Sequence, residues 1–151
     1  MTPIPPALAY RRAATQQASV VGLVIALYDT LAGDLRRGIA AMCQKNIEDR
    51  TNQLKHGFSV LTQLDSLIDI ERGGQTAINL RCFYGHIRQE MLRAQFTQDP
   101  SILERASALL LDVRGAWQEV DMRSDAGEVN AKAKVSNELF TEALTSFNCL
   151  A

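Results

Sequence analysis

The sequence has little of what a membrane-spanning, secreted or nucleic-acid-binding protein needs. No uninterrupted apolar run approaches the ~20 residues that a membrane-spanning helix requires. Residues 1–6 lack the basic and apolar regions of a secretory signal. Sixteen basic and seventeen acidic side chains nearly cancel, so the chain lacks the strong positive charge on which phosphate and lipid-surface affinity rests. We therefore expect a cytoplasmic protein with no nucleic-acid partner and no membrane insertion.

Motifs for catalysis, cofactors and metals are also missing. The ferritin-like di-iron site needs a Glu three residues before each ligating His, but Gln53 and Phe83 stand at that distance before His56 and His86. No Cys-x-x-Cys pair, phosphate-binding glycine loop or nucleophile elbow occurs. The sequence therefore predicts no enzyme, no metal and no cofactor.

The cysteines are odd in number and widely spaced, so they do not form a disulfide framework of the kind found in secreted domains. We interpret Cys43, Cys82 and Cys149 as reduced, small apolar side chains of a cytosolic protein.

The chain is rich in apolar residues spaced three and four apart, the period of an amphipathic helix. Glycines and prolines divide this pattern into four segments, and strand-like alternation is absent. Because the joints are short, sequential helices should be antiparallel neighbours, as in an all-α, up-down four-helix bundle. The predicted helices are Gln16–Gln44, Ile47–Asp69, Thr76–Thr97 and one that begins at Asp99-Pro100 and ends near Asp121.

We expect three parts: a flexible lead-in at residues 1–15, the bundle at residues 16–121, and a tail at residues 122–151. Pro3, Pro5 and Pro6 oppose a regular helix in the lead-in. The hypothesis for the tail is an amphipathic fifth helix that docks on the bundle, over an apolar surface that a partner protein would otherwise use. Its helical stripe consists of Val135, Leu139, Phe140, Ala143, Leu144 and Phe147.

Two features of the predicted helices have a structural and a functional explanation. Val21, Ile25 and Tyr28 lie beside the core stripe of the first helix, and Phe83 lies beside that of the third. Such a wide apolar arc either packs on two neighbouring helices or leaves part of its surface for a partner. Glycines inside the helices, such as Gly57, are either tolerated or needed where another helix approaches closely.

His56 raises an alternative function, because four-helix histidine-phosphotransfer domains also present an exposed helical histidine. Those domains usually carry a lysine and small residues one turn later, where Ser59 and Val60 stand here. An unrelated helical adaptor protein is a third possibility.

Several short segments lie in the predicted helices and near their junctions: Leu27-Tyr28-Asp29, Asn46-Ile47-Glu48, Leu67 to Gly74, Ala77-Ile78-Asn79-Leu80, and Arg114-Gly115-Ala116-Trp117. In their order and spacing these segments resemble the FliS family of flagellar secretion chaperones. The resemblance covers Tyr10 to Val120 and departs from the family at Ser19-Val20-Val21, where many members have a Ser/Thr-Pro pair.

The resemblance implies a function in the bacterial cytosol. Members of the family bind the C-terminal segment of flagellin before its export through the flagellar type III apparatus, which prevents premature polymerisation. The guest segment fills apolar grooves of the bundle, a form of helix-in-groove recognition. A contact with the flagellar export gate is a second partner that the resemblance raises.

The resemblance also suggests partner-binding residues. Val21, Ile25 and Phe83 are favoured because they lie off the predicted core stripes, whereas Leu80, Tyr84 and Ile87 also fit core packing. The lead-in with Tyr10 is expected to cover the groove when the guest is absent, and Asp29 is either a contact for the guest or a local surface charge. The full predicted set is Tyr10, Val21, Ile25, Tyr28, Asp29, Leu80, Phe83, Tyr84 and Ile87.

Overall fold

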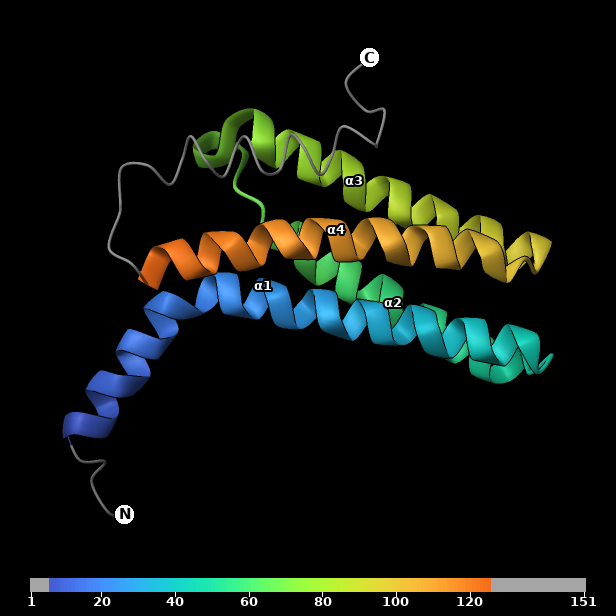
Figure 1. Ribbon diagram of the computed structural model, residues 1–151, viewed down its shortest axis with the longest axis horizontal. Coiled ribbons are helices and arrows are strands. Elements are labelled where there is room, and N and C mark those ends of the chain that lie inside the picture. The colour runs from blue at the N-terminus through green and yellow to red at the C-terminus, as the bar shows by residue number, and fades with distance from the viewer. Residues whose placement is uncertain (1–5, 126–151) are drawn as a thin grey trace.

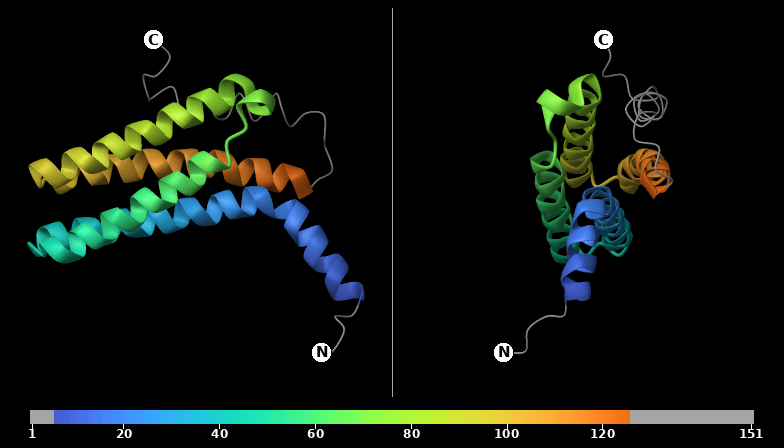
Figure 2. Two further views of the ribbon diagram at one scale, coloured as in Figure 1. Left: turned by 180° about the vertical axis from the view of Figure 1, so that it is seen from behind. Right: turned by 90° about the vertical axis from the view of Figure 1, so that its left-hand side faces the viewer.

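The computed structural model describes residues 6–125, which form four α-helices joined by short connections (Figure 1). These are α1 (Pro6–Cys43), α2 (Ile47–Ser66), α3 (Ile70–Thr97) and α4 (Pro100–Asp125), and no strand occurs in this range. Each helix packs on the next in the chain, and α1 also packs on α4, which closes the antiparallel bundle (Figure 2). The prediction of an all-α four-helix bundle is confirmed.

The helix ends follow from local polar residues. Asn46 caps α2 by accepting a hydrogen bond from the Asp49 N–H, and Asp69 caps α3 in the same way through the Arg72 N–H. At the start of α4, Asp99 accepts from the Ser101 N–H at 2.9 Å, and Pro100 takes the first helical position as predicted.

The start of α1 differs from the prediction. The helix begins at Pro6 rather than Gln16, so the interpretation of residues 6–15 as a non-helical lead-in is wrong. Proline is compatible with the first turn of a helix, and the Ala-, Arg- and Gln-rich residues that follow are strong helix formers. Residues 1–5 lie outside the described part of the chain. In Figure 1 the first turns of α1 point away from the other helices.

The other corrections concern the joint between α2 and α3. We expected α2 to continue to Asp69 and a joint at residues 70–75, but α2 ends at Ser66 and α3 begins at Ile70. A kink at Gly74 (φ 54°, ψ −134°) interrupts α3 after its first turn. This positive φ suits glycine, so the first turn of α3 takes a different direction from the rest of the helix. At the other end of the chain, α4 continues past Asp121 to Asp125.

The core is continuous across all four helices. Gly57 of α2 lies where the backbone approaches two neighbours: a Cβ atom there would come within 2.8 Å of Met91 Cε and 3.3 Å of Leu31 Cδ1. The close-approach explanation therefore holds at Gly57. The largest fully buried side chains are Tyr28, Leu31, Leu35, Leu54, Leu61, Leu64, Phe83, Tyr84, Ile87, Met91, Leu103 and Leu110.

The cysteines only partly follow the interpretation from sequence. Cys43 carries a free thiol but is exposed rather than packed. Cys82 is disulfide-bonded, so the interpretation of this residue as reduced is wrong. Cys149 and the hypothetical fifth helix lie outside the described residues. Within residues 6–125, no helix is long and apolar enough to cross a membrane.

Candidate partner-binding groove

A groove of about 380 Å³ opens at the end of the bundle where α2 stops and α3 begins. We call it the end groove. All four helices and the α2–α3 joint contribute to its walls, which are mainly apolar. The lining residues are Val24, Leu64, Leu67, Ile68, Asp69, Arg72, Gly73, Thr76, Ala77, Leu80, Tyr84, Trp117 and Val120.

The end groove exists because α3 is held less closely than the other helices. It packs less extensively on α2 and α4 than α1 does, and the kink at Gly74 turns its first turn aside (Figure 2). The side chains of the α2–α3 joint are then only partly covered, with Leu67 39% exposed. The polar rim includes Asp69 and Arg72, both exposed, whose side chains approach to 3.6 Å. Such a surface suits the apolar anchors of a bound peptide.

Tyr84 lines the end groove and is hydrogen-bonded to a second buried tyrosine, Tyr28, so that the pair joins α3 to α1. The Tyr28 hydroxyl donates a hydrogen bond of 2.9 Å to the Tyr84 hydroxyl, and the rings meet edge to face with centroids 6.1 Å apart. Burial, more than any other cause, raises the pKa of both phenols above the ordinary value. For Tyr28, a hydrogen bond from Trp117 acts in the opposite direction.

This tyrosine pair predicts a loss of stability in alkali. Unfolded tyrosines release their protons near pH 10, whereas the folded pair keeps them, so rising pH favours the unfolded chain beyond that point. We expect the free energy of unfolding to fall as pH rises above about 10, and more steeply than in a Tyr28→Phe/Tyr84→Phe double variant. Urea unfolding followed by circular dichroism at a series of pH values measures this. If the free energy of unfolding fell equally steeply with pH in the parent and in the double variant, the prediction would be contradicted.

The predicted partner-binding residues are divided between the groove and the core. Leu80 and Tyr84 line the end groove, while Val21 and Ile25 are half-buried on α1 and do not line it. The side chain of Tyr10 lies outside the described part of the structure. Those that are fully buried are Tyr28, Phe83, Tyr84 and Ile87.

The placement of Phe83 outside the core is therefore wrong. α3 has neighbours on two sides, α2 and α4, so it buries a wider arc than one stripe. Phe83 belongs to that arc, and its ring lies 6.0 Å from the ring of Tyr84.

Asp29 is a charge at the helix surface, 53% exposed, which is one of the two interpretations from the sequence, and its contact with a guest stays a prediction. Its carboxylate accepts two hydrogen bonds from the Arg114 guanidinium of α4, from Nε at 2.5 Å and from Nη2 at 3.1 Å. These hydrogen bonds raise the pKa of Arg114. The pair joins α1 to α4 at the surface of the bundle.

Several groove residues were missed because their sequence positions suggest core packing or a joint. Val24, Ile68, Trp117 and Val120 follow the apolar spacing of three and four residues that predicts burial in the core, and Leu67 directly precedes Ile68. One signal was available: Leu67 and Ile68 are apolar residues directly before a helix break, where polar residues are usual. Val20, which is 56% exposed, extends the apolar surface because it lies one turn before Val24 on the same face of α1.

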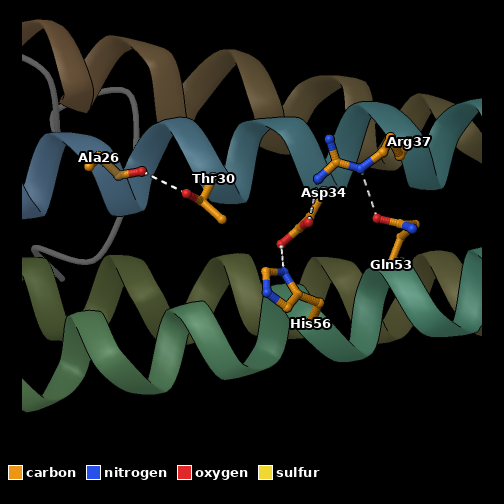
Figure 3. Close-up of polar contacts among 6 residues, drawn as sticks. All are labelled: Ala26, Thr30, Asp34, Arg37, Gln53 and His56. Atoms are coloured by element: carbon orange, nitrogen blue, oxygen red, sulfur yellow. Dashed lines mark hydrogen bonds and ion pairs between the residues drawn. The ribbon is translucent and has the colours of Figure 1, made fainter.

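A second polar cluster lies between α1 and α2, away from the end groove (Figure 3). The Asp34 carboxylate is buried, with 1% of the side chain exposed, and it lies 2.7 Å from His56 Nδ1 and 2.7 Å from Arg37 Nη2. Arg37 Nε also donates to Gln53 Oε1 at 2.8 Å. The cluster holds two α1 and two α2 side chains together. No group of three or more potential metal ligands occurs within the described residues.

Because Asp34 is buried, we expect Asp34→Asn to lower the free energy of unfolding much more than Asp29→Asn does. Asp34→Asn removes a buried charge that is hydrogen-bonded to Arg37 and to His56. We therefore expect the free energy of unfolding to fall by about 1–3 kcal/mol. Asp29 is 53% exposed, and Asp29→Asn should cost no more than about 1 kcal/mol. Chemical unfolding of both variants measures the difference. A loss for Asp29→Asn as large as that for Asp34→Asn would contradict the assignment of Asp34 as the structural carboxylate.

The described helices lie almost entirely within a match to a known protein family. The family model described as flagellar protein FliS matches residues 4–124. The flagellar secretion chaperone FliS of Vibrio cholerae is 28% identical over 93 residues, which cover 60% of this chain and 68% of the relative. FliSB of Pseudomonas aeruginosa is 29% identical over 86 residues (57% and 68%). The flagellar secretion chaperone FliS of Salmonella typhimurium is 24% identical over 116 residues (76% and 86%).

Proposed function

This chain belongs to the FliS family of flagellar secretion chaperones, and from that premise we propose that it binds the C-terminal segment of flagellin in the bacterial cytosol. The end groove is the observation that carries the proposal. It offers apolar surface from all four helices, bordered by exposed Asp69 and Arg72. Helical or extended peptides bind such surfaces through apolar anchors spaced three and four residues apart.

The chemistry of the groove is consistent with holding a guest that must later be released. Burial of apolar side chains favours binding, but ordering a disordered guest segment costs about 2–5 kcal/mol of the interaction free energy. The complex would then prevent the guest from polymerising before export without trapping it permanently. We include a contact with the flagellar export gate in the proposal as a second, weaker interaction.

The proposal is tested with full-length flagellin and with flagellin that lacks its C-terminal segment. We expect the chain to capture the first and not the second in a pull-down, and the isolated C-terminal peptide to bind in isothermal titration calorimetry. Equal capture of both flagellins would contradict recognition of that segment. A failure to capture either one would contradict the proposed function as a whole.

We propose no enzymatic step for this chain. The alternative, phosphoryl transfer through His56, would have to use ring Nε2, because Nδ1 is held 2.7 Å from the buried Asp34 carboxylate. Incubation with a labelled phospho-donor tests this alternative, and label retained on the parent but lost from His56→Ala would support it.

A further inference from the structure

The chain continues beyond α4 from a position beside the end groove. Val120 lines the groove, and α4 ends five residues later at Asp125. The family match stops at residue 124, so residues 126–151 add a segment beyond the part that the family model covers. Any structure that this segment forms therefore begins about 8 Å along the helix from the groove.

The sequence of this segment is suited to reach back and to bury an apolar face. Residues 126–134 consist of small residues interspersed with Glu128, Asn130, Lys132 and Lys134, and they can span up to ~30 Å when extended, which is enough to reverse direction. In a helix from residue 135 onward, Val135, Leu139, Ala143 and Phe147 would follow one another at steps of four and share one face with Phe140 and Leu144. Thr141 and Thr145 would lie on the opposite face.

The groove and the segment match in chemistry. Covering the apolar walls of the groove is favourable. The exposed Arg72 at the rim, which lies 3.6 Å from Asp69, is a second attachment point for the acidic Glu138 or Glu142 of the segment. We propose that the chain's own C-terminal segment, residues 126–151, docks as an amphipathic helix in the end groove when no guest is bound.

This inference extends the proposed function, because the segment and the guest would compete for one surface. A guest then meets a groove that is open in only a fraction of the molecules, and its apparent dissociation constant rises by the inverse of that fraction. If one molecule in ten is open, loss of the segment's apolar face strengthens guest binding about tenfold.

Occupancy of the groove can be measured without any guest. Trp117 is the single tryptophan of the chain and lines the end groove, so its fluorescence reports whether the groove is covered. The test compares the full-length chain with Phe140→Glu/Phe147→Glu, which places two charges on the apolar face. The matched control, Thr141→Glu/Thr145→Glu, adds the same charge on the opposite face. No sample contains reductant, so that Cys82 keeps its disulfide throughout.

We expect the Phe140→Glu/Phe147→Glu variant to show tryptophan emission at longer wavelength and stronger quenching by acrylamide, with the control variant unchanged. Identical fluorescence for all three proteins would overturn the inference and leave the proposed function untouched. A signal that depends on protein concentration would also overturn it, since the occupant would then be the segment of a second copy. A second measurement, titration with the flagellin C-terminal peptide, should show tighter binding to the Phe140→Glu/Phe147→Glu variant only.

Discussion

Replacing Leu67 with aspartate is expected to weaken binding of the flagellin C-terminal peptide by about tenfold or more, which corresponds to about 1.4 kcal/mol. Leu67 lines the end groove and is 39% exposed, so the new carboxylate would face the guest's apolar anchors and lose water when the guest binds. The bundle should remain folded, because Leu67 lies at the C-cap of α2 rather than in the core. A carboxylate at that helix end costs only about 0.3–1 kcal/mol.

The matched control is Leu92→Asp. Leu92 is also a partly exposed leucine, 43% exposed, but it lies on α3 away from the groove lining. Titration calorimetry should show near-parental affinity for Leu92→Asp and weak binding for Leu67→Asp, and thermal melting confirms that both are folded. Repeating the titration in the Phe140→Glu/Phe147→Glu background removes competition from the C-terminal segment. Equal affinities for the two aspartate variants would mean that the guest binds elsewhere.

Gly57→Val should produce the largest loss of stability, about 3 kcal/mol. A Cβ atom at this position already meets Met91 Cε at 2.8 Å and Leu31 Cδ1 at 3.3 Å, and the two further methyl groups of valine must push α2 away from both neighbours. Met91 is flexible enough to absorb part of the first contact, but Leu31 is fully buried in α1. For a chain of this size the midpoint of thermal unfolding should fall by about 6–12 °C.

Gly22→Val is the control for Gly57→Val. It makes the same substitution inside a helix, at a position where no atom of the described residues lies within 4 Å of the added Cβ. We expect its stability to stay within about 0.5 kcal/mol of the parent, since valine is a slightly better helix former than glycine. Similar losses at both positions would show that the cost comes from helix propensity rather than from the close approach of the helices.

Much of the fold could be predicted because it depends on local signals. Asn46 and Asp99-Pro100 mark the starts of α2 and α4 through their own side chains, and the apolar period of each segment specifies a helix. The start of α1 was missed because Pro6 is compatible both with a break and with a first helical turn. The kink in α3 was missed because two adjacent glycines can end a helix or redirect it, and only packing decides between these outcomes.

The candidate site was harder to predict because it consists of apolar side chains that the packing of the helices leaves exposed. Val24 and Trp117 fall on regular apolar stripes, and nothing local shows that the stripes reach beyond the closely packed part of the bundle. Phe83 shows the opposite error: it lies off the main stripe, yet it is buried because α3 has two neighbours. Which part of an apolar arc remains open depends on helix rotation and on the kink at Gly74, both of which are tertiary properties.

The looser packing of α3 has a consequence for the range of guests that the bundle can accept. α2, α1 and α4 form a firmly joined unit in which α1 is the shared partner, and α3 supplies the remaining wall of the end groove. A small outward shift of the first part of α3 would widen the groove while the extensive α1–α2 and α1–α4 contacts stay intact. We expect the width of the opening to be adjustable, so that under the proposed function side chains of different size at one anchor position are accommodated without loss of the native fold.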